Sequence, residues 1–582
     1  MNKAIVLTSL CLISLVDKVT FGFGEKTFFT TRSQSVNAVR ELVGWQHAIN
    51  RPDSEHMYAV FSITTEYSRS FRDKKIAEAL FGCSTLVFSG SRNGDRGEND
   101  ILADYFGLPS DFKSVLSITP RITNFVVDFN WYHGLDACVP GLFYRVHVPM
   151  VHTKWDLNLC ECEHVINAGT RFNTNEPDNP AASYPAGYLG PDRILLDDLP
   201  RSIQQALEGK TTFGDMRKPL QYGKVFGRQI MTRVSDIQCA LGWNFYRSDW
   251  YHAGLSLRFA IPAGNRSSAE FLFEPMIGNG GHWEFGAGFT GHVQLCQSED
   301  ERQALALYCD ANITHLFSAK QKRSFDFTNN GNGSRYILME EIASPSLTLF
   351  TDNAGNDLAQ NQYLRRLVPA INETTLDILI NIAIQADIVL KLAYQCENLE
   401  IDFGYNFYGR SKEKFCRCEK FESDRFGLKG DAQLYGFTAA QVAVPLNATQ
   451  SNATIKAGQD DGNADFRNFN ADNPAVAFTA GGGVLDQLTA ADATALGIAA
   501  DDVRLSNPAI LLKDEDLNIC SGLLPRATSH KIFAHINYEW LGYDDFIPYL
   551  GGGAAVEWST CRFRCDSGLS QWGIWFKGGI SY

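Results

Sequence analysis

Residues 376–394 read LDILINIAIQADIVLKLAY, and this stretch decides the fold class. Every even position is Leu, Ile, Ala or Tyr, whereas the odd positions include Asp377, Asn381, Gln385, Asp387 and Lys391. Alternation with a period of two predicts a strand with one apolar and one polar face. Strands of soluble proteins are usually about five or six residues long, and a strand that crosses a membrane needs about 9–11. The stretch therefore predicts a membrane-spanning strand.

A second strand with the same pattern follows at 399–408, where LEIDFGYNFY alternates apolar and polar positions. Only residues 396–398 separate the two strands, which predicts a tight antiparallel hairpin. One apolar and one charged face fit lipid outside and water inside a barrel. The same alternation occurs in 125–131, 142–148, 237–245, 255–261, 283–290 and 531–540.

The last strand carries a recognisable ending. Trp572, Ile574, Phe576, Ile580 and Tyr582 share one face of the segment 571–582, which closes the chain on an aromatic residue. This ending resembles the C-terminal signature of bacterial outer-membrane β-barrels of the porin-like class, although no specific family is matched. The resemblance implies insertion by the barrel assembly machinery through the C-terminal strand, and contact with outer-membrane lipids.

We therefore predict an all-β fold: a transmembrane, antiparallel, up-and-down β-barrel of about 14 strands, within a range of 12–16. Short turns are expected near residues 136, 249, 300, 397 and 544, and long extracellular loops at 161–232 and 413–527. Thirteen strands are plausible from Met57 onward. Because bacterial barrels have even strand numbers, Ser35–Ala48 could supply another, but its valines fit a helix equally well.

The ends and the charge of the chain bear on its location. Lys3 followed by the apolar Ala4–Val16 predicts a signal peptide over residues 1–24. Residues 25–56 would form an N-terminal segment or first strand, and residues 57–582 the barrel. The formal net charge of −14 argues against a nucleic-acid partner. Together these features predict export to the outer membrane.

The cysteines form pairs with close spacing. Because an exported chain experiences an oxidising compartment, we expect disulfides rather than zinc, and we expect no metal or cofactor. The spacing of Cys160, Cys162 and His164 leaves a metal cluster as an alternative. The disulfide candidates are Cys160, Cys162, Cys416, Cys418, Cys561 and Cys565.

The predicted function is a porin-like channel for passive diffusion of small hydrophilic solutes. A homo-oligomeric assembly stays open. Carboxylates outnumber bases among the charges predicted to face the lumen, which favours a mild cation preference. By strand phase, the pore-lining residues are Asp128, Arg145, Arg258, Glu284, Asp310, Asp377, Asp387, Lys391, Glu400, Asp402, Arg410, Lys531, Glu539 and Lys577.

Three other functions stay open. The first is a surface adhesin or structural barrel with a plugged lumen and functional outer loops. The second is a transporter of hydrophobic substrates, which needs an apolar path and an N-terminal plug, with Ser35–Ala48 as the candidate. The third is an enzyme. The sequence predicts no enzyme, because it holds no G-x-S-x-G, H-E-x-x-H or P-loop motif, although His147, His252, His292 and His535 fall on polar strand faces.

Overall fold

The computed structural model describes residues 23–45, 49–50, 58–91, 93, 95–165, 199–299, 302–343, 348–351, 357–359, 363–429, 435–437, 443–445, 453–456, 511–541, 546–559 and 567–582. The predicted signal peptide lies outside these residues except for Phe23 and Gly24, which are buried. Most of 161–232 before residue 199, and most of 413–527, also lie outside them.

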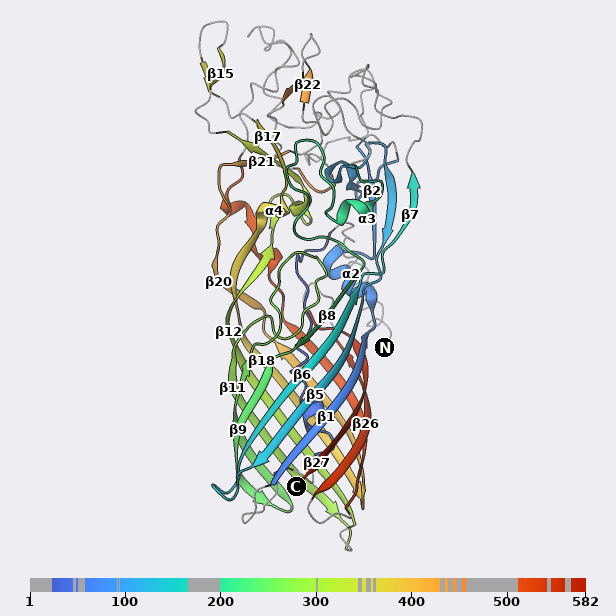
Figure 1. The fold of residues 1–582 in the computed structure, drawn as a ribbon, viewed down its shortest axis with the longest axis vertical. Coiled ribbons are helices and arrows are strands. Elements are labelled where there is room, and N and C mark those ends of the chain that lie inside the picture. Colours follow the sequence, from blue (N-terminus) through green and yellow to red (C-terminus); the bar gives the residue numbers. More distant parts are fainter. Residues whose placement is uncertain are drawn as a thin grey trace, which may run out of the picture.

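Twelve antiparallel strands form one closed barrel (Figure 1). The last strand pairs with the first, and the ring closes where β12 pairs with β18. Neighbours in the ring are joined by short turns at one end, called the turn end, and by longer connections at the other, called the loop end. In ring order the strands are β12 (Gln303–Ser324), β11 (Glu284–Gln297), β10 (Tyr251–Ile261), β9 (Ile237–Ser248), β6 (Leu142–Asp156), β5 (Arg121–Gly134), β1 (Tyr58–Ser70), β27 (Gln571–Ser581), β26 (Ile547–Trp558), β25 (Ala527–Glu539), β19 (Leu399–Arg410) and β18 (Thr375–Cys396).

The strand number corrects the prediction of about 14. Two further strands, β8 (Arg228–Val234) and β20 (Glu413–Cys418), extend the sheet to fourteen strands, but each pairs with only one barrel strand. They do not contribute to the closed ring. Ser35–Ala48, which the sequence leaves open between a strand and a helix, contains the short helix α1 (Ala38–Leu42). The five short turns lie where the sequence places them.

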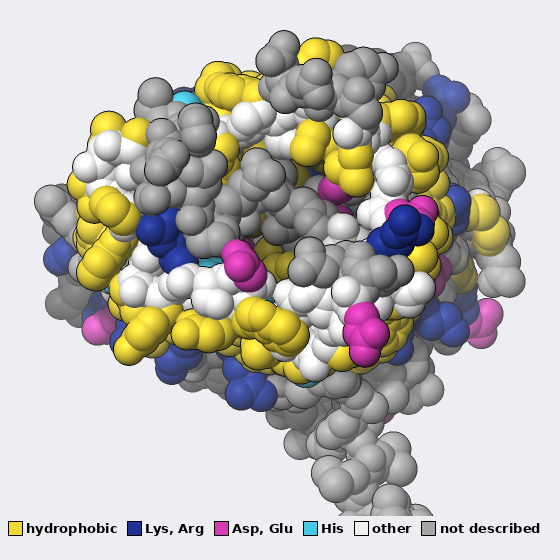
Figure 2. Space-filling view, turned by 90° about the horizontal axis from the view of Figure 1, so that it is seen from below, with side chains coloured by type: hydrophobic (Ala, Val, Ile, Leu, Met, Phe, Trp, Pro, Cys, Tyr) yellow, Lys and Arg dark blue, Asp and Glu magenta, His cyan; other side chains and the backbone are white. Residues whose placement is uncertain are grey.

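The two faces of the wall follow the alternation of the sequence. Outward side chains such as Phe403 and Phe576 are 58% and 64% exposed, whereas inward Asp128 and Asp402 are fully buried. Seen from the turn end, hydrophobic side chains surround the rim (Figure 2). Since lipid can cover these side chains, whereas water in contact with them would be unfavourable, the outer face suits a bilayer.

The stretch 376–394 is not one continuous lipid-facing stripe. The pairing of β12 with β18 shifts between Thr314 and Leu316, where β18 contributes one extra residue. A one-residue bulge moves every later side chain to the other face. Leu376, Ile378 and Ile380 are consequently buried in a core on the loop side. Ile382 is also buried, so the expectation that it faces lipid is wrong, whereas Ile384 is 56% exposed.

The connections at the loop end build a second layer with its own apolar core. Phe23 belongs to this core and stacks on Tyr336 with ring centroids 4.6 Å apart. Among the described helices, none is long and apolar enough to cross a membrane. Leu199, Ile203 and Leu207 are buried in and just before the short helix α3 (Ile203–Leu207). The layer contains α2 (Asp73–Phe81), β2 (Thr85–Ser89), β3 (Ile101–Leu102), β4 (Lys113–Ser117), β7 (Cys160–Val165), α3 (Ile203–Leu207), β13 (Asp326–Phe327), β14 (Leu338–Ile342), β17 (Tyr363–Pro369), α4 (Ile371–Thr374), β21 (Phe426–Leu428) and β24 (Leu517–Asn518).

Candidate functional site

The lumen is occupied by the chain's own N-terminal segment. Residues 32–45, which we call the plug segment, include α1, and all five residues of this helix are buried. Asn37 caps the helix by accepting a hydrogen bond from the Arg40 backbone N–H. One turn of helix is too short to be stable alone. Its stability therefore comes from contacts with the barrel wall.

Arg32 anchors the start of the plug segment. Its guanidinium lies 2.7 Å from Asp387 on β18 and 3.4 Å from Glu557 on β26. The same guanidinium stacks 4.5 Å from the centre of the Tyr408 ring. All these ion-pair side chains are less than one tenth exposed.

Arg40 and Glu41 make the second and third anchors. Arg40 Nε is 2.6 Å from Asp128 on β5, and its Nη1 is 2.8 Å from Glu66 on β1. Glu41 Oε2 is 3.3 Å from Arg145 on β6 and 3.2 Å from Arg258 on β10. The three charged residues of the plug segment thus reach six different strands.

The carboxyl end of α1 is held by ammonium groups. Lys577 Nζ donates to the carbonyls of Arg40, Glu41 and Val43 at 3.1, 3.2 and 2.8 Å. The last carbonyls of a helix have no partner within the helix and carry partial negative charge. A buried lysine from β27 therefore both satisfies these carbonyls and finds a partner for its own charge.

Trp45 closes the plug segment toward the turn end. It is completely buried, and its indole N–H donates to the Tyr549 hydroxyl at 2.7 Å. Lys577 Nζ lies 4.2 Å from the centre of its ring, within cation–π range.

A second element contacts the plug segment from the loop end. The connection 262–283, between β10 and β11, accepts a hydrogen bond from Gln34 at the Met276 carbonyl, 3.2 Å away. Gly278 N–H donates back to Gln34 Oε1 at 3.0 Å. The plug segment also contacts the turn between β8 and β9, where Ser33 and Ser35 donate to Asp236 Oδ2 at 2.7 and 3.1 Å.

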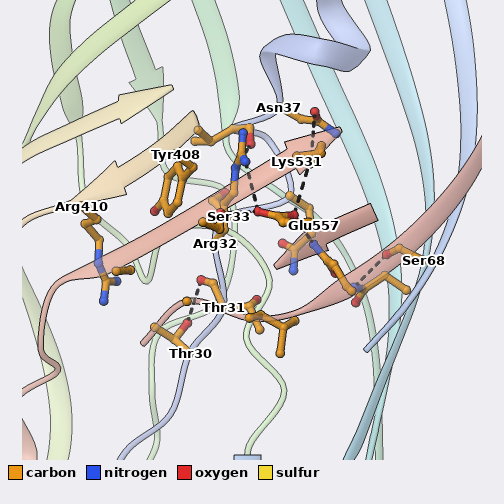
Figure 3. Close-up of a pocket in the computed structure, with 18 of the residues that line it drawn as sticks. Thr30, Thr31, Arg32, Ser33, Asn37, Ser68, Tyr408, Arg410, Lys531 and Glu557 are labelled. Atoms are coloured by element: carbon orange, nitrogen blue, oxygen red, sulfur yellow. Dashed lines mark hydrogen bonds and ion pairs between the residues drawn. The ribbon is translucent and has the colours of Figure 1, made fainter. Parts of the chain in front are cut away.

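A cavity of about 50 Å³ lies beside the start of the plug segment (Figure 3). Arg32, Lys531 and Glu557 meet on one side of it, and Arg410 points into it from β19. The Arg410 guanidinium donates to Ser567 Oγ at 3.2 Å. Because most of the residues that line it carry hydroxyl, amide or charged groups, the cavity suits a few water molecules.

The structure places the residues predicted to line a pore in three groups. Asp377 lies on the loop side of the bulge and pairs with Lys320 and Lys322, so strand phase misplaces it. Arg410 is half-buried. The others point inward and are less than one tenth exposed: Asp128, Arg145, Arg258, Glu284, Asp310, Asp387, Lys391, Glu400, Asp402, Lys531, Glu539 and Lys577. That they line a solute path stays a prediction.

The cysteine prediction is not supported at the pair that the structure describes. The Sγ atoms of Cys160 and Cys162 lie 3.5 Å apart, far beyond the roughly 2.05 Å of a disulfide. The side chains of Cys416, Cys418, Cys561 and Cys565 lie outside the described residues. Among the residues that the structure describes, no group of three or more His, Cys, Asp or Glu forms a metal site.

One lumen histidine, His147, bears on the enzyme alternative. His147 lies 3.4 Å from Glu41 and 3.5 Å from Asp128, which also bind arginines. Within the described part of the chain, no hydroxyl or thiol hydrogen-bonds to His147, so the histidine–nucleophile pair that hydrolases use is not formed there. His147 serves the charge network instead.

No family model matches the sequence, and no curated protein matches it. Among solved structures, the chain is similar to a FadL homologue of Pseudomonas aeruginosa, with 6% identity, a TM-score of 0.25, and coverage of 95% of this chain and 99% of the other. The chain is also similar to the monoaromatic hydrocarbon channel CymD, with 8% identity, a TM-score of 0.24, and coverage of 93% of this chain and 92% of the other. For the outer membrane protease OmpT of Escherichia coli, the identity is 8%, the TM-score is 0.18, and the coverage is 91% of this chain and 97% of the other.

At such TM-scores these similarities carry no argument about activity. The geometry of the chain itself defines its class. Its antiparallel ring has no open edge, its outer face is apolar and its inner face is charged, which is the architecture of proteins that span the outer membrane. The chain is an outer-membrane β-barrel with an internal plug.

Proposed function

We propose that this protein is an outer-membrane channel for small hydrophilic solutes, closed by its plug segment and opened when that segment moves. The observation that carries the proposal is the set of ion pairs from Arg32, Arg40 and Glu41 to six strands. Free diffusion through a permanently open lumen, as the sequence predicts, is replaced here by a gated path.

The chemistry of the wall supports a path that fills with water. A permanent interior is usually apolar, because burying charges costs more than packing hydrophobic residues of the same volume. This wall instead carries buried charged side chains on β5, β6, β10, β18, β19 and β27. When the plug segment leaves, water can hydrate these groups.

The charge balance of the wall supports a mild cation preference in the open state. On the barrel strands, buried carboxylates outnumber buried bases by nine to six: Asp128, Asp156, Glu284, Asp310, Asp387, Glu400, Asp402, Glu539 and Glu557 against Arg145, Arg258, Arg323, Lys391, Lys531 and Lys577. The plug segment contributes two arginines and one glutamate. Its departure therefore leaves a wall with excess negative charge, which favours cations.

Conductance in planar bilayers tests the proposal. The full chain is compared with a variant in which residues 32–45 are replaced by a Gly/Ser linker of equal length. We expect the parent to be closed for most of the recording and the variant to conduct steadily, with a reversal potential on the cation side in a salt gradient. A variant that migrates as a folded, heat-modifiable barrel but does not conduct contradicts the proposal.

That negative result would favour the second candidate, a surface barrel whose function lies at the loop end. The large apolar core of the loop-end layer supports this alternative. A path for hydrophobic substrates has weaker support. The plug segment supplies the N-terminal plug that such a transporter requires. However, an apolar path is also required, and the cavity beside the plug segment is lined by Thr30, Arg32, Asn37, Arg410 and other polar residues. Outer-membrane lipids and the barrel assembly machinery stay proposed partners, with the loop end outside the cell.

A further inference from the structure

Asp236 is a buried carboxylate at the junction of three segments. It lies between β8 and β9, it is completely buried, and it contacts the plug segment through Ser33 and Ser35. Within the described part of the chain, no Lys, Arg or His side chain forms an ion pair with it. The other carboxylates in contact with the plug segment, in contrast, all pair with bases.

The oxygen atoms around Asp236 are arranged closely. Oδ2 accepts both serine hydroxyls, the two Oγ atoms are 2.8 Å apart, and Ser235 Oγ lies 3.4 Å from Ser33 Oγ. Oδ1 is buried and receives no hydrogen bond of good geometry from the described residues. Gly278, with φ of +83°, leaves this oxygen room, because a Cβ atom there would lie 2.7 Å from Oδ1.

A second carboxylate without a base lies nearby. Glu284 is 2% exposed, and its hydrogen bonds from the described residues come from neutral donors, including Asn279 Nδ2 at 2.9 Å, one residue from Gly278. Ser35 and Glu284 line the same small cavity of about 20 Å³, which Arg258 also lines. The junction thus combines the formal charge of Asp236, the hydroxyl oxygens of Ser33, Ser35 and Ser235 and, beside Ser35, room for about one water molecule.

An ionised carboxylate without a partner is costly in a buried position, so the charge needs either a cation or a proton. Carboxylate and hydroxyl oxygens are ligands of hard cations, whereas soft metals prefer thiolate and thioether ligands. Among hard cations, Ca²⁺ takes six to eight oxygens from side chains, backbone carbonyls and water in flexible geometry.

We propose that Asp236, with the hydroxyl oxygens of Ser33 and Ser35, binds Ca²⁺ and ties the plug segment to the wall. The ion would stabilise the closed state, because the serines belong to the plug segment and Asp236 to the wall. The binding itself does not depend on the proposed function; only its effect on opening rests on that proposal.

Equilibrium dialysis of the full chain against radioactive Ca²⁺ tests the site, with protein refolded in detergent and freed of metal by a chelator. We expect one saturable site with a dissociation constant of about 10⁻⁴–10⁻³ M, as in extracellular Ca²⁺ modules. Asp236→Asn should lower the affinity at least about tenfold, whereas the control Asp377→Asn, at an exposed surface pair, should not change it. Ser35→Ala, which keeps the carboxylate, should weaken binding several-fold and replaces Asp236→Asn if that variant does not fold.

Equal Ca²⁺ binding by the parent and Asp236→Asn, or no saturable binding by the parent, overturns the proposal and indicates that Asp236 carries a proton. In bilayers, chelation should raise the open probability of the parent but not of Asp236→Asn. If the linker variant fails to conduct while Ca²⁺ binding remains dependent on Asp236, the proposed function is wrong and the cation site stands.

Discussion

Replacement of Arg40 by methionine should open the channel. Methionine keeps much of the volume of the side chain but removes the charge that Asp128 and Glu66 contact at 2.6 and 2.8 Å. Asp128 is completely buried and the Glu66 side chain is 15% exposed. In the closed state, both carboxylates would therefore lose their arginine without gaining full hydration.

The magnitude follows from the burial. Removing one partner of a buried ion pair costs about 3–5 kcal/mol, because the remaining charge stays desolvated. In the open state, water replaces the plug segment and hydrates both carboxylates, so most of this cost falls on the closed state. With about 1.4 kcal/mol for each factor of ten, the closed-to-open ratio should fall by roughly 10²–10⁴.

Single-channel recording at a fixed voltage measures the open probability directly. Arg302→Met serves as the matched control, because its pair with Glu397 is more than half exposed and such pairs contribute little. Adding Asp128→Asn and Glu66→Gln to Arg40→Met should restore closure, because no unpaired charge remains. An open probability of Arg40→Met equal to that of the parent would refute the reasoning.

Three further predictions concern the rest of the molecule. Phe403→Arg, at a side chain 58% exposed near the middle of β19, should destabilise the folded barrel by about 2–4 kcal/mol in a lipid unfolding titration; no loss would place this face away from lipid. Cys160 and Cys162 are exposed and their Sγ atoms lie 3.5 Å apart, so both should react with maleimide without prior reduction, which mass spectrometry detects; labelling only after reduction would indicate a disulfide. In the loop-end layer, burial works to raise the pKa of Glu341, but hydrogen bonds from Arg425 and Arg366 outweigh it and lower that pKa. The stabilisation is present above the glutamate's unfolded pKa of about 4.3 and is lost as pH falls through the lower folded pKa. Backbone hydrogen exchange of residues 338–342, corrected for intrinsic rates, should therefore become faster in acid. An exchange rate that does not change with pH would contradict this coupling.

The barrel hairpins could be predicted from the sequence, because the alternation of apolar and polar residues indicates which side chains face lipid. Phe125 and Trp131 on one side and Asp128 on the other emerge as the pattern predicts. The bulge in β18 could not be predicted, because apolar and polar residues alternate without interruption through Leu376–Tyr394, although the two halves of this stretch face different surroundings. Only the loop-end core, made by distant residues, explains why Ile378 and Ile380 are apolar.

The plug segment shows a different limit. Val36, Val39 and Val43 fit either a strand or a helix, and neither pattern indicates that the segment lies inside the barrel. The usable signal was the set of charges, Arg32, Arg40 and Glu41, in a stretch too polar for a lipid-facing strand. Their partners come from strands up to several hundred residues away, so the pairs depend on the closed ring.

The charge network also constrains how the plug segment can move. Arg32 pairs with β18 and β26, Arg40 with β1 and β5, and Glu41 with β6 and β10. A partial withdrawal would leave charges of both the segment and the wall unpaired while the lumen is still too narrow for water, and each such charge costs several kcal/mol. Full withdrawal admits water to every one of these groups. Intermediate positions are therefore the least stable, and the segment should leave as one unit, so that openings in single-channel records occur in one step and partial conductance levels are rare.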